Sequence, residues 1–290
     1  MLHNQLKCCL TSVLILLCLI SLSNLNAADT VAPVKVAASV PLPEHFANSV
    51  GMKLIGIPTG EYLCYGKAIK PKYLFPKPAG FNVKIERPFY IGETEVTREQ
   101  YQKVMGDKPA ESGKLPVNMV SWNEAVEFCR KLSELPDEKA AGRIYSLPTE
   151  REWQYAARAG SEYMFPYSSD DEMRVAEVAV CRDIYTSTMP KGVQAVGTKK
   201  PNAWGLYDTL GNVWEWVLDA PLAGGDIGYV TPSASAAAVE GKDYNRVIVG
   251  GGWDNDFRMC NLAARYSAPP GRKADNIGFR VLCRINKKVN

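Results

Sequence analysis

The densest group of chemically distinctive residues lies in the run PNAWGLYDTLGNVWEW, from Pro201 to Trp216. It holds three tryptophans and two carboxylates, Asp208 and Glu215, and is punctuated by glycine and asparagine. The run is too aromatic for a solvent-exposed loop and too interrupted for a long helix, so it predicts an irregular, tightly packed segment. Because buried polar side chains need partners, we expect both carboxylates to be held by specific groups.

Cysteine is the second residue type that could do chemistry. The chain has eight cysteines, and three of them (Cys8, Cys9 and Cys18) fall in an N-terminal apolar segment. The five that remain are an odd number, so at least one thiol is free, bound to a metal or paired between chains. No CxxC spacing occurs, which argues against a zinc ribbon. The preferred interpretation is a set of small buried side chains, or one or two disulfides compatible with export. The five are Cys64, Cys129, Cys181, Cys260 and Cys283.

A third group follows three consecutive glycines. The run RVIVGGGW predicts a strand from Arg246 that ends in a tight bend or a close backbone approach at Gly250–Gly252. Asp254, Asn255 and Asp256 come directly after the bend. Acidic and amide groups on one loop can bind a cation or sugar hydroxyls, but they are equally typical of a solvated turn, so both interpretations stay open.

Composition excludes several classes of function. The chain has only two histidines, His3 and His45, which removes Ser-His-Asp hydrolases, His-ligated zinc enzymes and most non-haem iron sites. The 34 basic residues nearly balance the 31 acidic ones, and no basic block is longer than a pair such as Lys287–Lys288. Nothing therefore favours nucleic-acid binding.

The N-terminus has the features of a secretory signal peptide over residues 1–27. Lys7 supplies a positive charge, Leu10–Leu22 is almost wholly apolar, and Ala27 offers a small residue for cleavage. A retained anchor is the alternative, but this apolar run is shorter than the roughly 20 residues of a membrane span. We expect an exported protein, periplasmic or secreted, with no membrane span after cleavage. Residues 28–43 are predicted to be a linker, and residues 44–290 a single domain.

Three helices are predicted from capping boxes, at Thr97–Gln100, Ser121–Glu124 and Thr149–Glu152. The first helix should end at Gly106 and the third at Gly160. The apolar face of the second helix is expected to consist of Trp122, Ala125, Val126, Cys129 and Leu132. Extended segments are expected within residues 49–64, 83–95, 246–253 and 276–284, and loops over 161–200 and 220–242. Together these elements predict an α+β fold with low regular content.

Seven segments resemble, in order, the formylglycine-generating enzyme family, also called the sulfatase-modifying factor family. The order and spacing hold from about Asn48 to Arg284. The resemblance implies a fold similar to that of C-type lectins, with sparse secondary structure. The segments are NSVGMKLIGIPTGEY, ERPFYIGETEVTREQY, LPVNMVSWNEAVEFCRKLSE, YSLPTEREWQYAARAG, PNAWGLYDTLGNVWEW, RVIVGGGW and NIGFRVLCR.

Archetypal members of this family oxidise one cysteine of a sulfatase to formylglycine, with molecular oxygen and a copper ion held by two cysteines after the glycine motif. Here the first of those positions falls on Asn255 and the second on Cys260. Soft thiolates select Cu(I), and one cysteine cannot make a bis-thiolate site. Cys181 and Cys283 are remote in sequence, and no pattern places them beside Cys260. The resemblance therefore leaves the copper site without one of its ligands, and whether the protein is an enzyme stays open.

The resemblance also implies a structural calcium ion. Its ligands would be the side chains of Asp208 and Glu215 and the carbonyls of Gly211 and Val213. Calcium takes six to eight hard oxygen ligands, which carboxylates and carbonyls in an irregular turn provide. In the alternative interpretation, Asp208 caps a turn and Glu215 pairs with an arginine.

Trp253, Asp254, Asp256 and Arg265 would line the substrate groove, although Arg265 and Arg280 could instead pack on aromatic rings and pair with carboxylates. Two functions compete. The first is a binding or accessory module that lacks the oxidase site and recognises a sulfatase polypeptide, another peptide or a glycan. The second is an active formylglycine-generating oxidase. The related iron-dependent sulfoxide synthases need several histidines, which this chain lacks.

Overall fold

The computed structural model describes residues 45–64, 81–106, 113–166, 174–182, 189–221 and 244–286. All of them lie in one compact unit, Ala37–Asn290. The predicted signal peptide and linker lie outside the described residues, as does most of the predicted loop over 220–242. The fold is α+β with short elements, as the sequence predicts.

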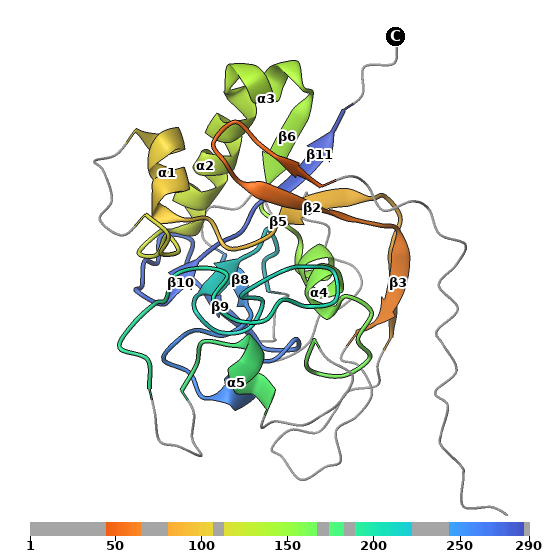
Figure 1. The fold of residues 1–290 in the computed structure, drawn as a ribbon, viewed down its shortest axis with the longest axis vertical. Coiled ribbons are helices and arrows are strands. Elements are labelled where there is room, and N and C mark those ends of the chain that lie inside the picture. The colour runs from red at the N-terminus through yellow and green to blue at the C-terminus, as the bar shows by residue number, and fades with distance from the viewer. Residues whose placement is uncertain are drawn as a thin grey trace, which may run out of the picture. The chain divides into compact units, whose positions relative to one another are not determined.

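A five-stranded antiparallel sheet runs across one part of this unit (Figure 1). The C-terminal strand lies inside this sheet, because Leu282 pairs with Ile91 on one side and with Ser146 on the other. Residues from opposite ends of the domain therefore share one hydrogen-bonded ladder. The strand order is β1 (Phe46–Ala47), β2 (Lys53–Ile57), β5 (Phe89–Gly92), β11 (Leu282–Ile285) and β6 (Arg143–Ser146).

A four-stranded sheet carries the aromatic run and the glycine bend. β7 (Trp214–Trp216) pairs in parallel with β10 (Ile277–Gly278) and antiparallel with β8 (Arg246–Val249), which in turn pairs with β9 (Arg265–Ala268). A separate pair joins β3 (Gly60–Leu63) to β4 (Asn82–Ile85). The two strands expected within residues 49–64 are thus present, but they belong to different sheets.

All three predicted capping boxes are present. Thr97, Ser121 and Thr149 cap α1 (Arg98–Met105), α2 (Trp122–Glu134) and α4 (Glu150–Arg158). α1 ends at Gly106 as expected, whereas α4 ends one residue before Gly160, at Ala159 with φ of 47°. The expectation of loop throughout residues 161–200 is wrong at one point, because Val175–Val178 form the short helix α5. The remaining helical segments are α3 (Pro136–Ala140) and η3 (Phe257–Met259).

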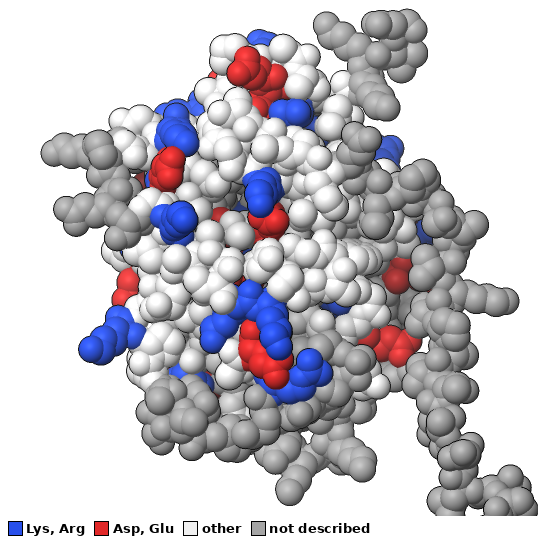
Figure 2. Space-filling view, viewed as in Figure 1, with Lys and Arg blue, Asp and Glu red and all other residues white. Residues whose placement is uncertain are grey.

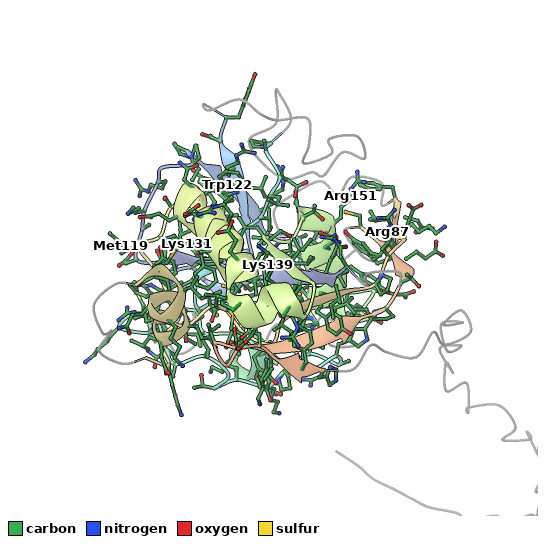
Figure 3. The ribbon with its side chains drawn as sticks, turned by 90° about the horizontal axis from the view of Figure 1, so that it is seen from above. Arg87, Met119, Trp122, Lys131, Lys139 and Arg151 are labelled. Atoms are coloured by element: carbon green, nitrogen blue, oxygen red, sulfur yellow. The ribbon has the colours of Figure 1, made fainter. Side chains whose placement is uncertain are left out.

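The core face of α2 differs slightly from its prediction. Ala125, Cys129 and Leu132 are buried as expected, and Phe128 joins them because it stacks on Tyr101 and meets the edge of Phe279. Trp122 is only partly buried: its Nε1 donates to the carbonyl of Val217 at 2.8 Å, and the Arg246 guanidinium lies 4.1 Å from its ring centroid. Figure 3 looks onto this helix, with Trp122 and Lys131 labelled. α2 therefore links the two larger sheets.

The face of the molecule shown in Figure 2 carries no large field of one charge. On the face shown in Figure 2, lysine and arginine side chains alternate with aspartate and glutamate, and broad uncharged areas lie between them. Within the described residues, no helix combines the length and the apolar character that crossing a bilayer requires.

Candidate functional site

A buried ion pair joins Glu215 of the aromatic run to Arg280 near the C-terminal end of the domain. Arg280 donates from Nη2 to Glu215 Oε1 at 2.6 Å and from Nε to Oε2 at 2.7 Å, and both side chains are 1% exposed. The guanidinium also donates to the carbonyls of Gly92, Tyr207 and Asp208. Trp153 Nε1 donates to the second oxygen of Glu215 at 2.7 Å. The interpretation in which Glu215 pairs with an arginine is thus confirmed, and Arg280 braces the core.

Two further buried carboxyl groups lie close to this pair. Glu95, which the sequence analysis did not single out, accepts hydrogen bonds from Asn212 Nδ2 at 2.9 Å and from the Val213 amide at 3.2 Å. Burial, and then the charges of Asp208 and Glu215, raise the pKa of Glu95 well above its ordinary value. Burial likewise raises the pKa of Asp208, although the amide of Gly197 donates to its Oδ2 at 2.6 Å. Three carboxyl groups thus lie near one guanidinium, and burial opposes the ionisation of two of them, Glu95 and Asp208.

The residues expected to bind calcium can be compared with the oxygen ligands that this ion requires. Asp208 Oδ1 is buried and accepts no hydrogen bond from the part of the chain that the structure describes, so this oxygen could take a cation. Glu215 Oε1 accepts one hydrogen bond, from Arg280, and a carboxylate oxygen has room for a second partner. Among the described residues, no three His, Cys, Asp or Glu side chains form a metal-binding group, so backbone carbonyls, such as those of Gly211 and Val213, would have to complete the coordination. Asp208 and these carbonyls are hard oxygen donors of the kind that calcium takes, whereas both oxygens of Glu215 are already engaged by Arg280.

The three glycines after β8 make the bend that the sequence predicts. Gly250 and Gly251 have φ of 91° and 84°, in the left-handed region that favours glycine. A Cβ atom on Gly251 would lie 2.7 Å from the carbonyl oxygen of Met259 and 2.8 Å from Cys260 Sγ. The bend is therefore packed directly against the segment that carries Cys260.

Asn255, at the position where the resemblance places the first copper-binding cysteine, has a structural role. Its Oδ1 accepts hydrogen bonds from Trp214 Nε1 at 2.7 Å and from the Gly252 amide at 3.0 Å. Its carbonyl accepts the amide of Arg182 at 2.8 Å. The side chain ties the loop to the aromatic run, and an amide is not a soft ligand for Cu(I). The family positions of this loop therefore do not fit a two-cysteine copper site.

Cys260 has a partner that the sequence analysis missed. The expectation that nothing brings Cys181 near Cys260 is wrong, because the two thiols share a hydrogen bond. Parallel bridges between Val180 and Gly211, and between Arg182 and Asp256, draw the segment after α5 alongside the loop. Cys260 is fully buried, while Cys181 is partly exposed at the edge of the same apolar cluster. No local sequence pattern signals such a long-range contact.

The other residues assigned to the groove fall into two places. Asp254 accepts both of its described hydrogen bonds from Asn276 Nδ2, at 3.0 and 3.1 Å, and Asp256 caps η3 and pairs with Arg258 at 2.8 Å. Trp253 is partly exposed and donates from Nε1 to the carbonyl of Asp275. Arg265, on β9, pairs instead with the buried Glu150 at 3.0 Å. Trp253, Asp254 and Asp256 share one loop, and Arg265 has its partner elsewhere.

A sparse α+β scaffold of this kind, with its loops held by buried aromatic and charged side chains, is typical of the C-type lectin-like fold shared by formylglycine-generating enzymes. The chain belongs to the sulfatase-modifying factor family, because the family profile described as "Sulfatase-modifying factor enzyme 1-like domain" matches residues 41–285.

Relatives in this family differ in activity. The chain is 34% identical to a formylglycine-generating enzyme of Streptomyces coelicolor over 57% of this chain and 51% of the relative. It is 31% identical to the inactive C-alpha-formylglycine-generating enzyme 2 of Mus musculus over 57% and 48%. The chain thus spans about half the length of these relatives. Among solved structures, Treponema denticola variable protein 1 matches with a TM-score of 0.64 and 27% identity, over 83% of this chain and 99% of the other.

Proposed function

We propose that this protein is an exported binding or accessory module of the family, without cysteine-oxidase activity. The observation that carries the proposal is Asn255: it stands where a copper-binding cysteine is expected, and both hydrogen bonds to its Oδ1 are used to brace the loop. Restoring a thiol there would remove that brace. The relatives of this chain include both a formylglycine-generating enzyme and a protein named as inactive. Loss of the reaction with retention of the scaffold is therefore compatible with the family.

The loop that follows the glycine bend is the surface proposed to bind. Trp253 offers a partly exposed aromatic ring, and Asp254 and Asp256 supply carboxylates on either side of Asn255. An aromatic ring beside fixed polar groups suits a peptide segment or a sugar ring, because it combines apolar contact area with directional hydrogen bonds. The proposed ligands are a sulfatase polypeptide, another peptide or a glycan.

We also propose a structural calcium ion, held by Asp208, the carbonyls of Gly211 and Val213, and Glu215. It would engage the oxygen of Asp208 that has no partner among the described residues, and its charge would favour the ionised form of the buried carboxyl groups. In this role the ion stabilises the aromatic run under the binding loop and takes no part in a reaction.

One observation favours a second candidate function, the active oxidase. The contact between Cys181 and Cys260 brings two sulfur atoms together at the edge of the loop, although only one of them comes from the loop itself. The two functions differ in one measurable product, because only the oxidase forms formylglycine.

The deciding experiment incubates the mature protein with a Cys-x-Pro-x-Arg peptide, copper and oxygen, and measures peptide mass and bound metal on the same sample. We expect no formylglycine and no stoichiometric copper. Formylglycine would establish the oxidase instead. In a parallel titration with the same peptide, Trp253→Ala should weaken binding about tenfold or more, as loss of an aromatic anchor does. Ile144→Ala, an exposed apolar substitution on the five-stranded sheet, is the matched control and should leave binding unchanged.

A further inference from the structure

We propose that Cys181 and Cys260 form a reversible disulfide that ties the segment after α5 to the loop after the glycine bend. The resemblance places the second copper position on Cys260 but assigns no role to Cys181, so it does not imply a link between the two. The inference is independent of the proposed function, because a crosslink could form in a binding module or in an oxidase.

The geometry starts from two backbone contacts on either side of Cys181. The carbonyl of Val180 accepts the amide of Asn212 at 2.7 Å, and the amide of Arg182 donates to the carbonyl of Asn255 at 2.8 Å. Cys181 is therefore fixed from both sides by residues of the aromatic run and of the binding loop. These bonds hold its backbone beside both segments.

Hydrogen bonds also hold the backbone and the thiol of Cys260. Its amide donates to the carbonyl of Phe257 at 3.0 Å at the end of η3, and its thiol lies 3.8 Å from the carbonyl oxygen of Gly252. The thiol is fully buried and shares its hydrogen bond with Cys181. Two thiols within hydrogen-bond reach of each other, each on a held backbone, are the starting arrangement that disulfide formation needs.

The two cysteines differ in how readily they react. The hydrogen bond with Cys181, followed by burial, raises the pKa of Cys260, and Asp256 and Asp254 add to the effect. Attack by a thiol requires the thiolate and access to solvent, so the partly exposed Cys181 should react first. Once Cys181 is in a mixed disulfide, its hydrogen bond no longer opposes ionisation of Cys260.

The oxidant is a small-molecule disulfide such as oxidised glutathione. The Cys181 sulfur attacks one of its sulfurs, which breaks that S–S bond, releases one thiol and leaves a mixed disulfide. The Cys260 sulfur then attacks the Cys181 sulfur and displaces the second thiol. The two protons leave the cysteines for the released thiolates, and the two electrons from the cysteines reduce the small-molecule disulfide. The product holds no thiolate at this loop, so the oxidised protein has no soft metal ligand there.

The test uses the mature protein, stripped of metal with a chelator and equilibrated in reduced or oxidised glutathione buffers. Remaining thiols are alkylated and the protein is digested for peptide mapping by mass spectrometry. We expect a linked peptide that joins Cys181 to Cys260, reversed by reductant. Because the crosslink restricts the unfolded chain, the oxidised form should also melt at least a few degrees higher than the reduced form.

Variants separate this crosslink from other redox effects. Cys181→Ser should abolish the difference in Tm between the two buffers, while Cys129→Ala, which removes a buried core thiol from α2, should retain it. If a variant fails to fold, the linked peptide from the wild-type protein alone decides. A different pairing, a pair that stays reduced across the glutathione series, or uptake of a thiophilic metal ion that blocks crosslinking would each overturn the inference.

Discussion

Arg280 and Glu215 make a twofold hydrogen-bonded ion pair in which neither side chain reaches solvent. The pair joins the C-terminal block of the chain to β7, and the guanidinium also holds carbonyls from β5 and from the turn that contains Asp208. Because Glu215 and several backbone carbonyls all depend on the guanidinium of Arg280, a substitution that removes this side chain should affect the whole domain.

Arg280→Met should lower the free energy of unfolding by about 3–5 kcal/mol, because it leaves the carboxylate of Glu215 buried without its counter-charge. Arg130→Met is the matched control. Arg130 pairs with Glu127 and Glu134 on the exposed side of α2, where such pairs contribute at most about 1 kcal/mol. Urea unfolding followed by tryptophan fluorescence measures both. Equal losses in the two variants would contradict the central role of Arg280.

Removal of calcium should lower the Tm of the wild-type protein. The difference between calcium and chelator should vanish in Asp208→Asn, which preserves the left-handed backbone (φ of 53°) but removes the charge. Asp137→Asn, on the exposed side of α3, should leave the calcium effect intact. Differential scanning calorimetry with and without chelator gives the result. An unchanged wild-type Tm on chelation would rule out the calcium ion.

Stability should fall as pH rises from about 5 to 8, because of Glu150. Burial raises its pKa from 4.5 to about 7, although Arg265 acts in the opposite direction and Asp219 adds to the increase. Between these two pKa values the folded state binds a proton that the unfolded state has lost, so folding is favoured at the acidic end and the advantage disappears above pH 7. The loss is on the order of 3 kcal/mol.

Glu150→Gln isolates this contribution, since glutamine keeps the shape of the protonated acid but does not titrate. We expect the pH dependence of the free energy of unfolding to be clearly flatter in the variant. A slope as steep as that of the wild-type protein would assign the effect to the other buried carboxyl groups whose pKa is raised by burial, Glu95, Asp208 and Asp219.

Asn255→Ala should destabilise the binding loop. It leaves the indole of Trp214 and the amide of Gly252 without their acceptor, at a cost of about 1–3 kcal/mol for each buried donor that finds no water. Asn255→Asp keeps an oxygen at the same place and should lose much less. Urea unfolding combined with proteolysis of the loop measures the difference. The brace would be refuted if both variants behaved like the wild-type protein.

Local sequence patterns predicted the elements that depend on neighbouring residues. Thr97, Ser121 and Thr149 each mark a helix start, because a capping box lies within four consecutive residues. The glycine bend and the packed aromatic run follow from residue type in the same way.

The contacts that define the site join distant segments and have no such signal. Cys181 meets Cys260 through two isolated parallel bridges, and Glu95 reaches Asn212 across the interior. The partner of Glu215 could be expected to be an arginine, but only the fold selects Arg280 from the others. The sequence therefore predicted which types of residue would be partners, whereas the particular residues that pair could be identified only from the three-dimensional structure.

The position of β11 has a consequence for how the chain is made. This last strand, Leu282–Ile285, separates β5 from β6 and supplies both with their hydrogen-bond partners. Until the ribosome has released these residues, the nascent chain exposes two open ladders and cannot close its core. Folding of this domain therefore waits until residues 282–285 are available, and a chain truncated before residue 282 should aggregate or be degraded rather than fold in part.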